Sequence, residues 1–149
     1  CGSFGAFATC SEPLRSYLIN CCSGFVSSTA LPPAVLGAVD AALDLLPTMD
    51  HERELLQEHS ARLLATLRSG SWDCRKSSSQ IVPVVVGREE EVIRLSQWLE
   101  GNGIFSVPMR PPTVEKGSCR LRLTVTADHH AEHIDRVTEL LDAWRERRG

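Results

Sequence analysis

Apolar and polar residues alternate strictly along C-R-L-R-L-T-V-T, residues 119–126. Successive side chains of a β-strand point to opposite faces, so this pattern predicts a strand with one apolar and one polar face. The apolar face carries Leu121, Leu123 and Val125. The polar face carries Arg120, Arg122 and Thr124. Two arginines therefore stand about 7 Å apart on a face that the core does not need.

The rest of the C-terminal half has apolar periods that predict the order β-α-β-β-α. Strands are expected at residues 81–86 and 104–108, with Pro83 indicating either an edge strand or the end of a strand. Helices are expected at residues 89–100 and after Asp128, which would cap the last helix. That helix would turn Ile134, Val137, Leu140, Leu141 and Trp144 inward and end in the basic residues Arg145, Arg147 and Arg148. We therefore expect an α+β module from about residue 75, with helices on one face of a small sheet.

The residues ahead of this module are predicted to be mainly helical. A short strand is expected at residues 4–9, a helix after Ser11-Glu12-Pro13, and a loop or short strand at residues 23–30. A further helix opens at Pro32-Pro33 and is broken by Pro47. The next helix, at residues 50–67, has an apolar face that includes His59, which we interpret as a core or boundary residue.

Composition limits the functions open to the chain. Its 149 residues are 42% hydrophobic and 23% charged, with a net charge of -3. An ordinary soluble composition without a basic excess gives no reason to expect nucleic-acid binding. Its apolar runs are too short to cross a bilayer, and it lacks the pattern of a signal peptide, so we expect no membrane association and a cytoplasmic location.

The six cysteines have irregular spacing and form no C-x-x-C pair. In a chain long enough to bury a core, this pattern favours free thiols over a disulfide framework. The first residue is Cys1 and not methionine, and a glycine-rich turn and a predicted strand follow it directly. We interpret the chain as part of a longer protein.

The polar face of the alternating strand is the first candidate site. Arg110 precedes two prolines that fix the path of its backbone, and Thr113 follows them. A guanidinium held near that of Arg122 would form a fork suited to a carboxylate. The alternative is that these arginines are simply solvated on an open sheet face.

A second candidate lies in F-V-S-S-T-A-L-P-P, residues 25–33. Three hydroxyl groups stand directly before a helix that begins with proline, and hydroxyls beside free backbone N–H groups suit a phosphate. The alternative is an ordinary helix cap.

Three histidines near the last helix, His129, His130 and His133, raise the question of a metal site. Metal centres need a third and often a fourth ligand, and the neighbouring Asp128 and Glu132 are explained by capping. We therefore predict no metal site.

Several stretches, taken together, resemble the C-terminal part of the α-oxoamine synthases, which are pyridoxal-phosphate enzymes of fold type I. In family order they are G-A-F-A-T-C-S-E-P-L-R-S-Y-L, F-V-S-S-T-A-L-P-P-A, Q-I-V-P-V-V-V-G, R-P-P-T-V-E-K-G-S-C-R-L-R-L-T-V-T-A and H-I-D-R-V. The resemblance covers essentially the whole chain. It implies a remnant of the large cofactor domain at residues 1–30, connecting helices at 31–68 and the small α+β domain at 69–149.

The resemblance also implies roles for individual residues. Arg122 matches the residue that binds the carboxylate of the amino-acid substrate, Thr113 a residue that contacts substrate, and Arg110 an arginine near the same carboxylate or the acyl substrate. Ser28 and Thr29 match a pair that reaches across a homodimer to the phosphate of pyridoxal 5'-phosphate in the partner subunit. Arg120, by contrast, is interpreted as structural.

The lysine that holds the cofactor lies upstream of Cys1 in the family pattern, and neither Lys76 nor Lys116 stands at its position. The resemblance therefore predicts no catalytic residue in this chain and no activity of the chain alone. The departures from the pattern are Glu115-Lys116, where many relatives have proline, and Cys21-Cys22, where arginine is common.

In the intact enzyme the resemblance implies a decarboxylating condensation of an amino acid with an acyl thioester. The R-P-P-T loop favours members that join L-alanine to a pimeloyl thioester over members that use glycine. The nature of the acyl carrier, coenzyme A or a carrier protein, stays open. So does a different class of function, a non-catalytic amino-acid-binding α+β module.

Overall fold

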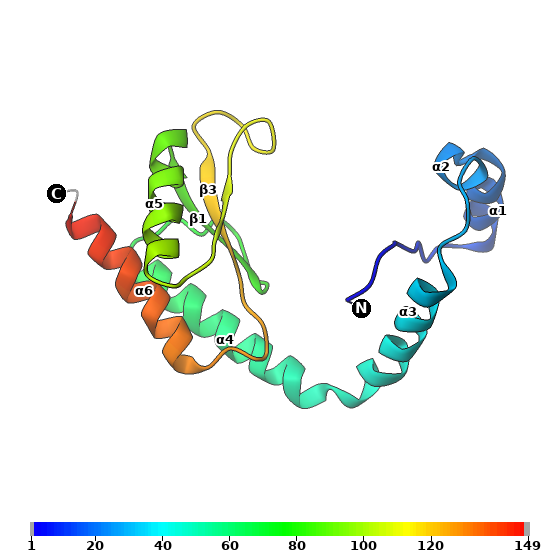
Figure 1. Cartoon of the computed structure of the whole chain (residues 1–149), viewed down its shortest axis with the longest axis horizontal. Coiled ribbons are helices and arrows are strands. Elements are labelled where there is room, and N and C mark those ends of the chain that lie inside the picture. The colour runs from blue at the N-terminus through cyan, green and yellow to red at the C-terminus, as the bar shows by residue number, and fades with distance from the viewer. Residues whose placement is uncertain (1, 148–149) are drawn as a thin grey trace. The chain divides into compact units, whose positions relative to one another are not determined.

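The computed structural model describes residues 2–147. The chain divides into two compact units, Cys1–Met49 and Asp50–Gly149. Figure 1 shows the elements of both. The predicted domain limits at residues 30/31 and 68/69 stay predictions, whereas the division into units falls within the predicted connecting helices.

The N-terminal unit consists of helices: α1 (Glu12–Cys21), α2 (Ser23–Val26), α3 (Pro33–Leu45) and the 3-10 turn η1 (Leu46–Thr48). The strand expected at residues 4–9 is wrong, because this segment has no strand hydrogen bonds and its side chains are exposed. A strand needs a neighbour to pair with, and the described part of the unit offers none. Part of the expected loop at residues 23–30 instead forms α2.

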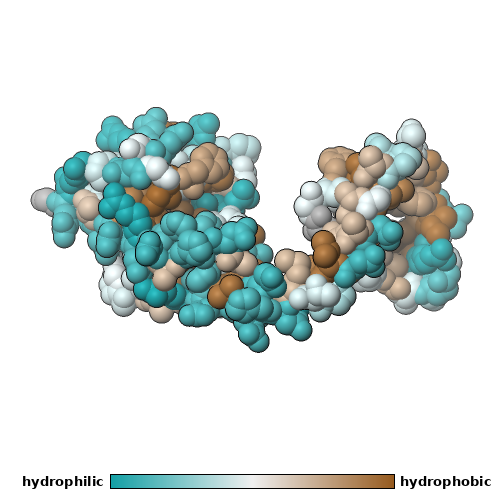
Figure 2. Space-filling model, turned by 60° about the horizontal axis from the view of Figure 1, so that its bottom comes forward, coloured by the Kyte–Doolittle hydropathy of each residue, from teal (hydrophilic) through white to brown (hydrophobic). Residues whose placement is uncertain are grey.

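No residue described in the N-terminal unit is buried. Many of its large apolar side chains are exposed to solvent, for example Phe7 with 80% of its surface exposed and Tyr17 with 64%. All but two of the exposed large hydrophobics of the described chain lie in this unit. In Figure 2 its helices carry broad hydrophobic areas, whereas hydrophilic residues dominate the visible surface of the C-terminal unit.

The C-terminal unit begins with α4 (Asp50–Ser69) and continues through β1 (Ile81–Gly87), α5 (Glu89–Gly101), β2 (Val107–Met109), β3 (Cys119–Thr124) and α6 (Ala131–Glu146). The strands form an antiparallel sheet in the order β1-β3-β2. β1 is therefore an outer strand, one of the two alternatives that Pro83 indicated. The expected β-α-β-β-α order and the helical layer on one face of the sheet are confirmed (Figure 1).

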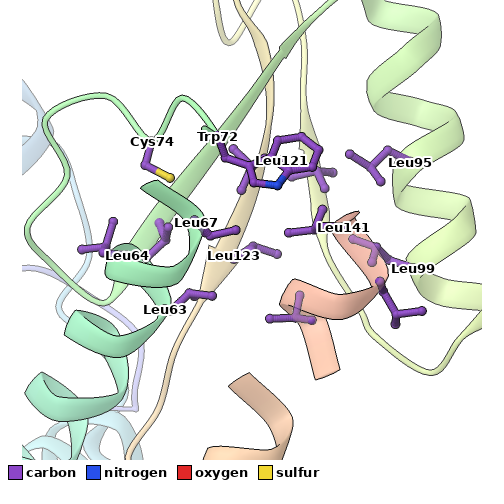
Figure 3. Close-up of a cluster of buried hydrophobic side chains, with 14 of the residues drawn as sticks. Leu63, Leu64, Leu67, Trp72, Cys74, Leu95, Leu99, Leu121, Leu123 and Leu141 are labelled. Carbon is purple, nitrogen blue, oxygen red and sulfur yellow. The ribbon is translucent and has the colours of Figure 1, made fainter. Parts of the chain in front are cut away.

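The core of this unit lies between the sheet and the helices α4, α5 and α6. Leu121, Leu123 and Val125 of the central strand are buried, and Arg122 and Thr124 on its other face are exposed. Figure 3 shows how leucines from α4, α5, β3 and α6 converge with Trp72 and Cys74. The labelled members are Leu63, Leu64, Leu67, Leu95, Leu99, Leu121, Leu123 and Leu141.

Cysteines in the described residues are free thiols. Cys74 and Cys119 are buried, whereas Cys10, Cys21 and Cys22 are exposed. Burial raises the pKa of the Cys74 thiol, and the charge of Asp73 adds to this effect while that of Arg68 opposes it. Cys74 therefore serves as a small apolar core residue and stays protonated at neutral pH.

The strand expected at residues 104–108 begins only at Val107. The backbone N–H of Ile104 still donates to the carbonyl of Leu99 at the end of α5, at 2.8 Å. The carbonyl of Ser106 accepts a hydrogen bond from the buried Ser96 hydroxyl at 3.1 Å. These bonds hold the segment against the helix, so it joins the sheet late.

The basic end of α6 does more than complement the helix dipole. Arg145 stacks on the ring of Trp72 with its guanidinium carbon 3.6 Å from the ring centroid, and it donates to the carbonyls of Gly70 and Ser71. Arg147 stacks similarly on Trp98 at 4.0 Å. Both contacts tie the last helical turn to the rest of the unit. Arg148 lies outside the described residues.

The predicted cap of the last helix at Asp128 is wrong, because α6 starts at Ala131 and His130 is its N-cap residue. The backbone N–H of His130 donates to Nδ1 of His133 at 3.1 Å. One turn earlier, the backbone N–H of Thr126 donates to Nδ1 of His129 at 3.0 Å. Imidazole nitrogens therefore accept the backbone hydrogens at this terminus, and each Nδ1 must be unprotonated to do so.

The pKa of His129 is lowered from 6.5, first by burial and then by the charges of His133, His59 and His130, while Asp128 opposes the shift. The unfolded chain thus takes up a proton at this site at a higher pH than the folded chain. The stability that the neutral ring contributes is complete above the unfolded value of 6.5 and is lost as the pH falls towards the lower folded value.

Replacing Leu121 by alanine tests the central position of β3 in the core. The side chain is completely buried. We expect the free energy of unfolding to fall by about 2–5 kcal/mol, because the truncation leaves a cavity. Thr124→Ala, on the exposed face of the same strand, should change it by about 0.5 kcal/mol or less. If urea titrations showed the same loss of unfolding free energy for both variants, this assignment of the two faces would be contradicted.

Replacing His129 by asparagine tests the cap. Asparagine can place Oδ1 where the imidazole has Nδ1, so it keeps the acceptor but cannot titrate. The unfolding free energy of the variant should fall less than that of the native chain between pH 7.5 and pH 5. Thermal unfolding across this pH range would detect the difference. Parallel slopes for the native chain and His129→Asn would disprove the mechanism.

Candidate functional site

Arg122 lies in the middle of β3, opposite Pro83 of β1 and Val107 of β2. Its side chain is exposed on the face of the sheet away from the buried leucines. Within residues 2–147 its guanidinium has no hydrogen-bond or ion-pair partner. A stiff strand thus presents an arginine with all its donors available for a planar anion.

Arg120, two residues earlier, is bound within the protein. Its Nε donates to the backbone carbonyl of Ser118 at 3.0 Å, and its Nη2 to the Ser118 hydroxyl at 2.8 Å. The side chain is half-buried and folds back along its own strand. This geometry agrees with a structural role for Arg120.

Arg110 does not form the expected fork with Arg122. Its Nη1 binds Oε1 of Glu89, in the first turn of α5, at 2.9 Å, and both side chains are about half exposed. Register also separates the two arginines, because Val107 is opposite Arg122 and Arg110 lies three residues further along. That is about 10 Å by strand rise. The sequence pattern did not predict that Glu89, at the start of α5, would form an ion pair with Arg110.

Thr113 lies in a tight turn in which its backbone N–H donates to the carbonyl of Arg110 at 2.9 Å. Its exposed side chain lines a shallow pocket of about 660 Å³ that also includes Arg120 and not Arg122. The other residues of this pocket are Arg75, Pro112, Val114, Glu115 and Ser118.

Arg122 lines a larger groove of about 710 Å³ at the end of β3. Its walls come from β3, the segment between α5 and β2, the start of α6 and Leu63 of α4. Histidines His129 and His133 line it together with Arg136. Sequence reasoning did not identify this groove, because its walls come from four separate stretches that only the fold brings together.

Ser28 and Thr29 precede α3 in the N-terminal unit and are exposed. The Ser28 hydroxyl donates to the carbonyl of Phe25 over a long 3.3 Å, and the Thr29 hydroxyl has no partner in the described residues. The Thr29 hydroxyl can therefore donate to a phosphate directly, and the Ser28 hydroxyl can do so by giving up its long bond to Phe25. This chemistry fits the phosphate of pyridoxal 5'-phosphate.

Among residues 2–147, no group of three or more histidine, cysteine or acidic side chains is placed to hold a metal ion. No helix within that range is long and apolar enough to cross a membrane.

Curated relatives match nearly the whole chain. An 8-amino-7-oxononanoate synthase of Gluconacetobacter diazotrophicus is 43% identical over 146 residues, which are 97% of this chain and 37% of the relative. One of Geobacter metallireducens is 42% identical over 144 residues, with 95% and 37% covered. A protein of Desulfosudis oleivorans, provisionally given the same name, is 48% identical over 145 residues, with 97% and 38% covered. The chain thus spans somewhat more than a third of the length of these relatives.

Solved structures share the fold. The 8-amino-7-oxononanoate synthase of Francisella tularensis has a TM-score of 0.78 at 23% identity and matches 93% of this chain and 40% of its own. The serine palmitoyltransferase of Sphingomonas wittichii has a TM-score of 0.76 at 24% identity, with 89% and 34% covered.

The sequence profile of the family described as Aminotransferase class I and II matches residues 1–141. Since this match covers nearly all of the 149 residues, the chain belongs to the aminotransferase class I and II family.

Proposed function

We propose that this chain forms the small domain and part of the large domain of a pyridoxal-phosphate-dependent acyltransferase. The reaction condenses L-alanine with a pimeloyl thioester, releases carbon dioxide and gives 8-amino-7-oxononanoate, an intermediate of biotin synthesis. Two relatives named 8-amino-7-oxononanoate synthase are 42–43% identical to the chain over at least 95% of its length, and they support this activity more than any other. The expected cytoplasmic location belongs to the same proposal.

The observation that carries the proposal is the free guanidinium of Arg122 on the open face of β3. A substrate carboxylate can bind both outer nitrogens without displacing a protein partner. The neighbouring Arg120 and Arg110 are already bound by Ser118 and Glu89, so Arg122 is the available arginine of the three. Its position on a strand fixes the carboxylate and thereby the orientation of the bond that breaks at the α-carbon.

Ser28 and Thr29 would bind the cofactor's phosphate through their hydroxyls, as the resemblance implies across a homodimer interface. When bound, pyridoxal phosphate supplies the electron sink for the carbanion chemistry. Thr113 would contact substrate from its turn beside Arg120. Arg110 would act at a distance through its ion pair with Glu89, which holds the turn against the start of α5.

The exposed apolar residues of the N-terminal unit support an assembly with further protein surface. A unit of 49 residues without a buried side chain in its described part cannot supply the free energy of its own folding from burial. We infer that the remainder of a large domain and a second subunit cover Phe7, Tyr17 and their exposed neighbours.

A chimeric enzyme tests the function directly. The stretch of the Gluconacetobacter diazotrophicus relative that matches this chain, 37% of its length, is replaced by the 149 residues. We expect the chimera to form 8-amino-7-oxononanoate from L-alanine and a pimeloyl thioester. Arg122→Gln in the chimera should lower kcat/KM for L-alanine by about a hundredfold or more, since it removes a charged, bidentate contact.

Arg94→Gln is the matched control, because Arg94 is an exposed arginine on α5 that lines neither pocket. Its chimera should keep the activity of the unaltered one. Turnover of glycine in preference to L-alanine would assign the chain to the glycine-using synthases instead. A folded, cofactor-loaded chimera without activity on either amino acid would refute the proposal.

A further inference from the structure

The groove beside Arg122 has an uneven distribution of charge. Two arginines and two histidines line it, Arg122, Arg136, His129 and His133, and no aspartate or glutamate is among its lining residues. Such a surface raises the local concentration of anions and lowers that of cations. The groove therefore selects for a ligand that carries negative charge.

The capping geometry of α6 decides what the two histidines offer the groove. Each ring uses Nδ1 to accept a backbone hydrogen bond, from Thr126 to His129 and from His130 to His133. A neutral imidazole that accepts at Nδ1 carries its hydrogen at Nε2. Both rings consequently keep an N–H donor, and neither offers a further acceptor.

Acidic residues near the groove do not cancel its cations. Asp135 is held by Arg62 of α4, with Nη2 and Oδ2 2.7 Å apart. Glu139 approaches Arg136 only to 3.7 Å, in a solvent-exposed pair that contributes little free energy. Asp128 is adjacent to His129 in sequence but does not line the groove. The donors of Arg122, and most of those of Arg136, remain available.

The remaining walls are largely apolar. They include Ile104, Phe105, Val107 and Ile134, and Phe105 has 82% of its surface exposed. An inorganic anion would leave these side chains in contact with water. A flexible aliphatic chain would cover them and gain free energy in proportion to the apolar area removed from water.

We propose that this groove binds the acyl part of the thioester substrate, with the chain against Ile104, Phe105 and Ile134 and its free carboxylate at His133 and Arg136. The identity of the ligand rests on the proposed function, because a pimeloyl chain is an aliphatic chain that ends in a carboxylate. The groove would then bind such chains in preference to ordinary fatty acyl groups, which have no terminal carboxylate to pair with His133 and Arg136.

A binding experiment on the 149-residue chain tests the groove without requiring catalysis. Pimelate is titrated into the isotope-labelled protein, and changes in the backbone amide chemical shifts, followed by NMR, locate the binding site. We expect shifts around residues 104–107 and 129–137, and a much weaker effect from 1-heptanol, which has an aliphatic chain but no charge. Shifts confined to other parts of the chain would overturn the proposal.

Two variants locate the carboxylate. Arg136→Gln removes a positive charge, and His133→Asn removes the Nε2 donor while its Oδ1 preserves the cap of α6. Each should weaken pimelate binding by about threefold to tenfold, as expected for a partly exposed charged or polar contact. Arg94→Gln, the same change on α5, should leave the affinity unchanged. Equal affinity of all these folded variants would disprove the assignment.

The chimera separates this inference from the proposed function. In an active chimera, Arg136→Gln should raise KM for the pimeloyl thioester and leave KM for L-alanine unchanged, whereas Arg122→Gln should affect L-alanine. If the chimera is inactive but pimelate still binds in the groove, the proposed function is refuted, while the binding of a carboxylate-bearing aliphatic chain in the groove stands. If the chimera is active and Arg136→Gln leaves its KM for the pimeloyl thioester unchanged, the groove does not bind the acyl chain, while the proposed function stands.

Discussion

The central strand β3 is paired on both sides, with β1 along residues 119–124 and with β2 along residues 120–122. Two ladders fix its register, so its side chains cannot exchange faces without breaking both sets of backbone bonds. Burial of Leu121 and Leu123 beneath the helices therefore determines that Arg122 faces outward. The candidate carboxylate site is a direct consequence of how the core is packed on the other face of the strand.

The two units of the chain are stabilised in different ways. Asp50–Gly149 has a contiguous core, and its last helix is held by stacked arginine–tryptophan contacts. The described part of Cys1–Met49 has helices but no buried side chain. The chain matches 37% of the length of two of its relatives, so in those proteins the matched region is accompanied by further chain.

Sequence reasoning predicted the C-terminal module well because its signals are local and agree with each other. The alternation at residues 119–126 predicted which side chains of β3 are buried, and Pro83 indicated an outer strand as one of two alternatives. The contacts between distant segments could not be read in this way. Nothing in the sequence pairs Arg110 with Glu89, or shows that the residue capping α6 is a histidine instead of Asp128.

The candidate site was predictable only residue by residue. Arg122, Thr113 and Ser28 were identified from short motifs and from family resemblance, and their roles stay predictions. The structure adds the local environment: Arg122 has no protein partner among the described residues, while Arg110 and Arg120 do. The groove that joins Arg122 to His133 depends on loop paths and helix starts, which vary more than strand patterns and leave weaker traces in a sequence.

The outer position of Pro83 has a consequence for the behaviour of the protein at high concentration. Its nitrogen carries no hydrogen, so the outer border of β1 lacks one of the donors that an incoming strand would need. The backbone N–H of Val85 already donates to the carbonyl of Asp73 at 2.9 Å, and the carbonyl of Ile81 accepts from the Ser77 hydroxyl at 2.7 Å. The opposite border belongs to β2, which is only three residues long. Neither border is a good template for intermolecular β-pairing, so the sheet itself resists growth into aggregates even where the chain displays apolar surface elsewhere.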